Sequence, residues 1–289
     1  MTTGEKYMTN FCDLHTHSDF SDGTDSPARL LDLAEQAGLC AVALTDHNTV
    51  SGLPAFLEAA RGRKLRAIPG TEFSTDYNGI ELHILGLFLR PEHFAAVTER
   101  TEEYQRRKEE SNIQLVRRLK EAGYAIDYQT IKAATAGGQV NRARIGAELA
   151  RLGYVESVQD AFAKLLKPKH GYYVPPKRES PFEIIRFIKS LGAVAVLAHP
   201  FLNLNEQQLR EFLDEAVKWG LDGMETMYST YDRETAALSH RIAQAYGLLP
   251  SGGSDYHGEI KPHIEIGIGQ GDLRVPKEYL LALEERAGK

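Results

Sequence analysis

The stretch that decides the fold is Phe11-Cys12-Asp13-Leu14-His15-Thr16-His17-Ser18-Asp19-Phe20-Ser21-Asp22-Gly23. Its first four residues are mostly apolar and predict a short buried strand, and two histidines follow directly. Side chains repeat every two residues along an extended chain, so His15 and His17 face the same way and could hold one metal ion. In α/β folds, strand ends of this kind deliver functional residues into one pocket.

The same arrangement recurs along the chain, because six of the ten histidines fall in clusters at the ends of apolar, β-branched runs. Glu81 and His83 alternate on one expected strand, so spacing alone leaves both Glu72 and Glu81 open as ligands. Mixed nitrogen and oxygen ligands suit Zn, Mn or Fe better than Mg or Ca. The clusters are His15, His17 and Asp22; Asp46 and His47; Glu72 and His83; and His199, Asp255 and His257.

Composition bounds the class of protein. The 289 residues are 42% hydrophobic, which is enough for one large core or a core with an insert. A formal net charge of −6 argues against duplex nucleic acid as a partner, because such binding needs clustered Lys and Arg. Cys12 and Cys40 lie in apolar stretches, so we expect free thiols and a reducing, cytoplasmic compartment. The polar start of the chain and the short apolar runs predict neither a signal peptide nor a membrane span.

Apolar runs alternate with amphipathic segments near both ends of the chain. Strands are expected at 11–14, 40–45, 65–69 and 80–89, with helices at 26–38 and 51–62. After a helix that begins at Ser180, further strands are expected at 193–198, 223–227 and 248–249, with helices at 206–219 and 231–246. This rhythm of about seven strand-helix units predicts a parallel sheet or barrel.

The middle of the chain interrupts the rhythm. A long charged helix is expected at 91–123, shorter helices at 128–135, 142–153 and 157–166, and no strand between 100 and 171. A helical insert in a barrel loop is the simplest account. We therefore divide the chain into a first barrel part (1–99), an insert (100–175) and a second barrel part (176–289). The charges at 100–110 are expected to face solvent.

Taken together, the clustered motifs resemble those of the PHP (polymerase and histidinol phosphatase) family. The resemblance covers about 10–89 and 176–269, with its motifs in the right order. It implies an α/β fold, a distorted (β/α)7 TIM-like barrel, with a trinuclear metal site at the C-terminal ends of the strands. The motifs are 15–23, Leu44-Thr45-Asp46-His47, Gly70-Thr71-Glu72, His83-Ile84-Leu85-Gly86, Ala198-His199-Pro200 and Gly253-Ser254-Asp255-Tyr256-His257-Gly258.

The resemblance also implies which residues hold three divalent ions, with Zn, Mn and Fe as the candidate metals. All nine implied positions carry a side chain that can bind a metal, as expected of an active family member. The implied sets are His15, His17, Glu72 and Asp255 for the first ion; Glu72 as a bridge, His83 and His199 for the second; and Asp22, His47 and His257 for the third.

Three clustered cations suit the hydrolysis of a phosphate ester, because they convert water to hydroxide at neutral pH and neutralise phosphoryl oxygens. We expect direct attack without a covalent intermediate. The expected catalytic residues are Asp255, His199 and His257, the histidines as proton donors where the metals leave them free. Asp46 and Glu225 are expected either to orient imidazoles from behind or to be purely structural.

Within the family, the helical insert resembles the branch of 3′,5′-nucleotide bisphosphate phosphatases and RNA 5′-end exonucleases. The supporting segments are 141–146, 153–162 and 171–175. The usual Gly-Arg-Pro-His run of that branch is altered, since Arg142 keeps the arginine and Arg144 replaces the histidine. A basic belt in this region is expected to bind a second substrate phosphate. It comprises Arg142, Arg144, Lys167, His170 and Arg178.

The favoured function is therefore a metal-dependent phosphatase, a phosphoric ester hydrolase, that acts on a small phosphorylated nucleotide. The favoured substrate is a 3′,5′-bisphosphonucleotide. Three alternatives stay open: histidinol phosphate as substrate, 5′-3′ trimming of short RNA, and a non-enzymatic module that binds a partner. The complete ligand set favours an enzyme, and the sequence carries no signature of oligomeric state.

Overall fold

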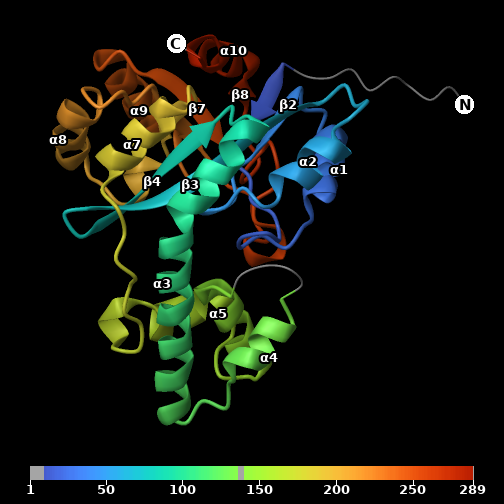
Figure 1. The fold of residues 1–289 in the computed structure, drawn as a ribbon, viewed down its shortest axis with the longest axis vertical. Helices are drawn as coiled ribbons and strands as arrows, with labels where there is room; N and C mark the ends of the chain where they lie inside the picture. Colours follow the sequence, from blue (N-terminus) through green and yellow to red (C-terminus); the bar gives the residue numbers. More distant parts are fainter. Residues whose placement is uncertain (1–9, 136–139, 289) are drawn as a thin grey trace, which may run out of the picture.

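The computed structural model describes residues 10–135 and 140–288, and it shows an α/β barrel with a helical insert at one end (Figure 1). The predicted fold class is thereby confirmed. One mixed sheet of eight strands builds the barrel, in the order β7-β6-β5-β4-β3-β2-β1-β8. The strands are β1 (Phe11–Asp13), β2 (Ala41–Leu44), β3 (Arg66–Tyr77), β4 (Ile80–Leu87), β5 (Val194–Leu197), β6 (Gly223–Tyr228), β7 (Leu249–Gly253) and β8 (Val275–Pro276).

The sheet curls until its ends almost meet. β1, β2 and β3 are parallel to one another, and so are β5, β6 and β7. Across the gap between β1 and β7, the Leu14 amide donates to the Gly252 carbonyl over 3.2 Å. A parallel bridge between Thr16 and Tyr256 continues this contact beyond the strands. The residues that follow β1 and β7 are therefore neighbours at one rim of the barrel.

One part of the strand pattern differs from the prediction. β3 and β4 form an antiparallel hairpin, and β4 is also antiparallel to β5. The turn at Asn78-Gly79 is the reason, because both residues have positive φ (54° and 84°), as tight two-residue hairpin turns require. The strand expected at 65–69 therefore extends to Tyr77, and a wholly parallel sheet was wrong. Asn-Gly between apolar runs is the sequence signal for this hairpin.

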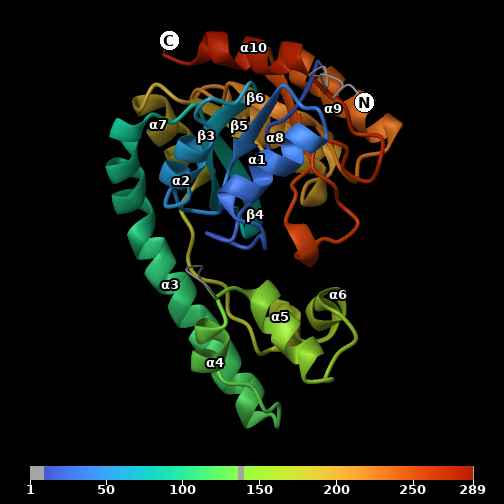
Figure 2. The same cartoon turned by 90° about the vertical axis from the view of Figure 1, so that its right-hand side faces the viewer.

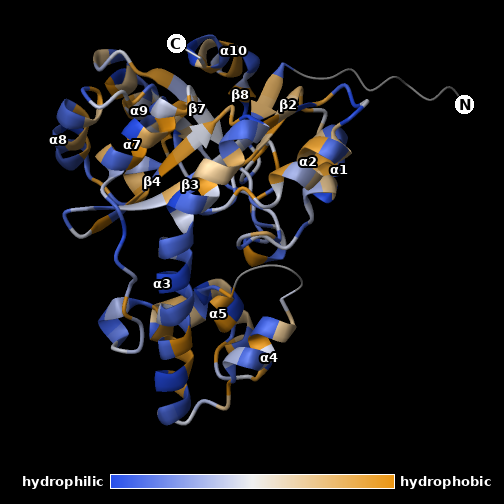
Figure 3. Ribbon diagram, viewed as in Figure 1, coloured by the Kyte–Doolittle hydropathy of each residue, from blue (hydrophilic) through white to orange (hydrophobic). Residues whose placement is uncertain are grey.

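Helices cover the outside of the barrel. Ser26 caps α1 by accepting from the Arg29 amide, and Ser180 caps α7 through the Phe182 amide. In two perpendicular views, α10 lies at the end of the barrel away from the insert (Figures 1 and 2). The barrel strands are mainly hydrophobic (Figure 3). The helices are α1 (Pro27–Gln36), α2 (Leu53–Ala59), α7 (Pro181–Ser190), α8 (Glu206–Ala216), α9 (Arg233–Ala245) and α10 (Lys277–Arg286).

The insert is built on α3 (Phe94–Glu121), which runs from the barrel along the length of the insert (Figure 2). Leu115 and Leu119 of α3 join Ile145 and Leu149 in an apolar cluster separate from the barrel core. The described residues between 100 and 171 contain no strand, as predicted. None of the helices in the described ranges is long and apolar enough to cross a membrane. The other insert helices are α4 (Tyr128–Ala133), α5 (Arg142–Arg151) and α6 (Val158–Ala161).

A substitution of Gly253, at the end of β7, would test the close approach of β7 to β1. A Cβ at this position would lie 2.4 Å from His15 Cβ and 2.6 Å from the His15 backbone nitrogen. We expect Gly253→Ala to lower the free energy of unfolding by about 1–3 kcal/mol, because backbone has to move. Gly86→Ala is the matched control, since the nearest atoms to its Cβ would be in the side chains of Ile188 at 3.3 Å and Phe73 at 3.5 Å, and no backbone atom is among them. Equal urea midpoints for the two variants would contradict this account.

Candidate metal centre

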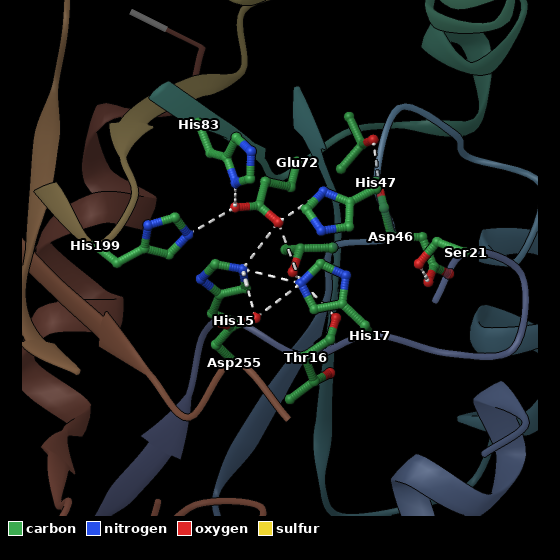
Figure 4. A network of polar contacts seen from close by, with 12 residues as sticks. His15, Thr16, His17, Ser21, Asp46, His47, Glu72, His83, His199 and Asp255 are labelled. Carbon is green, nitrogen blue, oxygen red and sulfur yellow. Dashed lines mark hydrogen bonds and ion pairs between the residues drawn. The ribbon is translucent and has the colours of Figure 1, made fainter. Parts of the chain in front are cut away.

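The nine side chains predicted as ligands converge at the rim of the barrel, and Figure 4 labels all of them except Asp22 and His257. They form four overlapping sets, and within each set the ligand atoms lie within 4.8 Å of one another. Two residues that share a set commonly come from strands far apart in the sequence. The sets are His17, Asp22, His47 and His257; His15, Glu72 and His199; His15, His17 and Asp255; and His47, Glu72 and His83.

The Glu72 carboxylate occupies the middle of the cluster. Its Oε1 is 2.8 Å from His83 Nδ1 and 3.0 Å from His199 Nε2. Its Oε2 is 3.2 Å from both His15 Nε2 and His17 Nε2. The Glu72 side chain is 0% exposed. One buried carboxylate therefore faces two pairs of histidines, each pair through a different oxygen.

Glu81, the other glutamate left open by the sequence, lies on the far side of His83. Its Oε1 is 3.3 Å from His83 Nε2 and 2.7 Å from Arg178 Nη2. It belongs to none of the four donor sets in the described residues. The geometry therefore favours Glu72 as the central carboxylate and makes Glu81 a link between His83 and Arg178.

Asp255 presents its two oxygens to different partners. Oδ1 faces the first histidine pair, at 3.3 Å from His17 Nε2 and 3.6 Å from His15 Nε2. Oδ2 accepts from the Tyr228 hydroxyl at 2.7 Å and from Lys261 Nζ at 2.6 Å. No sequence motif marks Tyr228 or Lys261 as partners of Asp255, because the fold brings them together. Together they fix the orientation of this carboxylate.

Asp22 lies among a third group of imidazoles. Its Oδ1 is 3.2 Å from His257 Nε2, and its Oδ2 is 3.6 Å from His47 Nε2. His47 also faces inward, with Nδ1 3.1 Å from Glu72 Oε2. The donors around Asp22 and those around Glu72 are therefore continuous, with His47 between them.

Buried polar atoms without a hydrogen bond test whether this cluster fits metal ions. Among the described side chains, His17 Nδ1, His47 Nδ1 and Glu72 Oε2 are buried and make no hydrogen bond, although each lies within 4.0 Å of a carboxylate oxygen or an imidazole nitrogen of the cluster. A buried polar atom that makes no hydrogen bond costs about 1–3 kcal/mol. Coordination to a cation removes that cost, and mixed imidazole and carboxylate donors suit Zn, Mn or Fe. The residues fit a cluster of divalent cations.

The three carboxylates of the cluster remain ionised. Burial alone would raise the pKa of Glu72, yet His47 and the other imidazoles around it hold that pKa well below its usual range. The pKa values of Asp22 and Asp255 are also held well below their usual range, because nearby positive groups outweigh burial. The site therefore offers three negative charges to cations at neutral pH.

Glu225 supports the cluster from behind. Its Oε1 is 3.0 Å from His15 Nδ1, and its Oε2 accepts from the His199 amide at 2.7 Å. His199 has a φ of 28°, a backbone conformation that non-glycine residues rarely adopt. Glu225 thus orients one imidazole and holds the strained backbone of another donor.

Asp46 lies beside the loop that carries Asp22. Its Oδ1 accepts from the Ser18 amide at 2.8 Å and from the Ser21 hydroxyl at 2.6 Å. Its Oδ2 accepts from the Ser18 hydroxyl at 2.6 Å. Both oxygens are therefore used by this loop. Of the two roles left open by the sequence, these contacts favour the structural one over orientation of an imidazole.

A cavity of about 140 Å³ separates the metal donors from the insert. Asp22, His47 and His83 line this cavity, and so does a basic wall consisting of Lys108, Arg142 and Arg178. The Arg142 guanidinium stacks on the Tyr173 ring at 4.3 Å from its centre. The structure therefore brings two residues of the predicted basic belt, Arg142 and Arg178, to the site.

The other three residues of the belt do not line this cavity. Arg144 lines a separate cavity of about 330 Å³, because residues two apart on a helix do not face the same way. Its Nη2 lies 3.4 Å from the Gly23 carbonyl. Lys167 is exposed at the start of the helical turn Pro168–His170, and His170 is only partly buried at the end of that turn.

Helix α3 supplies the residues that the sequence analysis missed. Tyr104, Lys108 and Asn112 are spaced four residues apart, so they share one face, and all three line the cavity. The segment 100–110 was expected to face solvent, and for Lys108 the structure corrects this. Burial lowers the pKa of its ammonium group. The four-residue spacing was the available signal.

Comparisons with known proteins agree with this geometry. The family model of the PHP domain matches residues 13–181. A 5′-3′ exoribonuclease of Haemophilus influenzae is 31% identical over 251 residues, which cover 86% of this chain and 91% of the relative. A 3′,5′-nucleoside bisphosphate phosphatase of Chromobacterium violaceum is 27% identical over 247 residues, with 85% and 86% covered. A solved structure from Bifidobacterium adolescentis, assigned as a metal-dependent phosphoesterase, has a TM-score of 0.85 at 28% identity, with 96% of each chain covered.

The barrel, the donor cluster and these relatives define a metal-dependent phosphoesterase. The chain belongs to the PHP family. The family predicted from the motifs is therefore confirmed, and so is the assignment as a phosphoric ester hydrolase.

Glu225 tests the support behind the donors. We expect Glu225→Gln to weaken metal binding by about 10- to 100-fold, because a neutral amide orients His15 less firmly than a carboxylate does. The measurement is competition with a chromophoric chelator. Glu102→Gln is the control, since Glu102 is exposed on α3. Equal metal affinities for the two variants would show that Glu225 has no part in the site.

Proposed function

We propose that the protein hydrolyses phosphomonoesters of small nucleotides, with a 3′,5′-bisphosphonucleotide as the favoured substrate. The observation that carries this proposal is the cavity of about 140 Å³, which has metal donors on one side and three cationic side chains on the other. Such a cavity suits a small ligand with strongly negative groups. The bisphosphate phosphatase of C. violaceum among the relatives supports the same substrate class.

The nine donors are proposed to hold three divalent ions, with Zn, Mn or Fe as the metal. Bound cations would supply activation of a water molecule and neutralisation of the phosphoryl oxygens. The donor sets in the structure overlap with the grouping implied by the family motifs but do not reproduce it. His17 joins the set around Asp22, and His83 and His199 each share a set with Glu72 but not with one another. The proposed holders are His15, His17, Glu72 and Asp255; Glu72, His83 and His199; and Asp22, His47 and His257.

The other side chains of the site are proposed to bind and orient the substrate. Arg142 and Arg178 line the same cavity as the metal donors and would donate hydrogen bonds to substrate phosphate oxygens. Both nitrogens of His257 have partners, since Nδ1 is 2.8 Å from the Asp255 carbonyl and Nε2 faces Asp22. His199 is therefore the better candidate to protonate the leaving oxygen. Asp255 would contribute its Oδ1 to the metal centre, and the hydrogen bonds to its Oδ2 fix the orientation of that carboxylate.

A second candidate function is 5′-3′ exonucleolysis of short RNA. The 31% identity to the exoribonuclease of H. influenzae favours it. The two candidate functions differ in the product that is released, which is phosphate in the first case and a nucleotide in the second. Release of both products should therefore be compared on adenosine 3′,5′-bisphosphate, a short 5′-phosphorylated RNA and histidinol phosphate. Nucleotide release from RNA at a higher kcat/KM than phosphate release from the bisphosphate would replace the first proposal with the second. Metal content without hydrolysis of any of the three would support the partner-binding alternative.

We also propose a cytoplasmic location, and neither duplex nucleic acid nor a membrane as a partner. The support is that Cys12 and Cys40 are both free and buried, which suits a reducing compartment. The net charge of −6 supports the absence of duplex nucleic acid among the partners.

Metal removal tests the three-ion centre. Elemental analysis of the purified protein is expected to give about three divalent ions per chain. Chelation should lower the Tm, because ligands that bind only the folded state stabilise it by about 2.7 kcal/mol at one hundred times their Kd. Adding back Mn or Zn should restore both Tm and phosphate release. A chelated protein that keeps full activity would rule out this centre.

His199 tests the assignment of the second ion and of the proton donor. We expect His199→Ala to reduce turnover by about 10²- to 10⁴-fold while the protein stays folded. The control is His240→Ala, because His240 is exposed on α9, where its Nδ1 lies 3.5 Å from the Tyr279 hydroxyl. Steady-state phosphate release and circular dichroism are the measurements. Unchanged turnover in the His199 variant would refute the assignment.

A further inference from the structure

Lys108 enters the site from the insert. It lies near the middle of α3, one helical turn after Tyr104 and one before Asn112, and the three side chains line the cavity next to the metal donors. The opposite side of that cavity contains His47 and His83. Lys108 is therefore placed to contact a ligand that reaches the metal centre.

The Lys108 ammonium has no counter-ion of its own. In the described part of the chain, no carboxylate lies within 4.0 Å of Lys108 Nζ, although most cations of α3 are paired. A partly buried cation without a carboxylate partner is costly, because it has lost part of its hydration. An anionic ligand in the cavity would remove this cost.

Arg178 provides an independent sign of a ligand. Its side chain is 7% exposed, and its Nη2 pairs with Glu81 at 2.7 Å. Its Nε is buried and has no hydrogen-bond partner among the described residues. A guanidinium group that keeps a free N–H in a cavity is prepared to bind an oxyanion.

Arg142 completes the basic wall. Its guanidinium stacks between the rings of Tyr173 and Phe162, with centres at 4.3 Å and 5.4 Å. Its one hydrogen bond in the described residues is a long one, 3.5 Å to the Leu166 carbonyl. The rings hold the plane of the guanidinium and leave its N–H edge available. Among the described residues, Glu81 is the one carboxylate within 4.0 Å of a cation of the wall, so the wall keeps excess positive charge.

We propose that Lys108, together with Arg142 and Arg178, binds a second phosphate group that is not the one hydrolysed, and that Lys108 determines specificity for substrates with two phosphates. This inference rests on the proposed phosphatase function. The metal donors attract the reacting phosphoryl group, and the basic wall faces them across the cavity. A ligand that joins two phosphates satisfies both sides at once, whereas a monophosphate leaves one side unpaired.

The test compares substrates with one and two phosphates. We expect Lys108→Met to lower kcat/KM for adenosine 3′,5′-bisphosphate by about 10- to 100-fold, the loss expected for one hydrogen bond to a charged group. For adenosine 3′-monophosphate and adenosine 5′-monophosphate the change should stay below about threefold. Lys108→Arg should keep most of the preference. The control is Lys120→Met, because Lys120 is exposed on the same helix.

A binding measurement separates this inference from the proposed function. Titration calorimetry of adenosine 3′,5′-bisphosphate into chelator-treated protein should show a Kd at least about tenfold weaker in Lys108→Met than in the wild type, with equal binding of the two monophosphates. Equal loss of activity on all three nucleotides would overturn the role of Lys108 in specificity. A wild type that binds the bisphosphate but hydrolyses none of the nucleotides would overturn the function and leave the subsite standing.

Discussion

The buried carboxylate of Glu72 is the constraint on which the rest of the site depends. A charge that is fully removed from water needs partners of opposite sign, and here imidazoles from several strands surround it. The same carboxylate presents one oxygen to each of two histidine pairs, so it sets the spacing of the whole cluster. The surrounding imidazoles belong to His15, His17, His47, His83 and His199.

The β3–β4 hairpin is what allows this arrangement. Glu72 pairs with Leu85 in the hairpin, and Ser74 pairs with His83, so the glutamate and the histidine are neighbours on adjacent strands. If β4 ran parallel to β3, the start of β4 would lie at the other end of the barrel, and His83 would be far from the other donors. The tight turn at Asn78-Gly79 reverses the chain direction directly after β3. It thereby brings His83 to the rim of the barrel where the other donors lie.

Helix α3 packs against both the barrel and the insert, and it places Lys108 near the metal donors. Val97 near its start belongs to the barrel core, whereas Leu119 near its end belongs to the core of the insert. Between them, Gln105 donates to the Asn48 carbonyl in the loop that follows His47. One rigid helix therefore anchors both units and holds the charged middle segment, with Lys108, over the metal donors.

The sequence by itself determined the order of strands, the positions of the donors and the family, because the alternation of apolar runs and the motifs are local features. It also indicated the helical insert. Spacing alone could not choose between Glu72 and Glu81. The resemblance of the motifs favoured Glu72, and the pairing of β3 with β4 places Glu72 at the centre of the cluster. The antiparallel hairpin has a local signal, Asn78-Gly79 between apolar runs. Only the tertiary structure decided the approach of Lys108 to the metal donors and of Tyr228 to Asp255. Both depend on how α3 and β6 pack against residues far away in the sequence, and such packing has no local pattern.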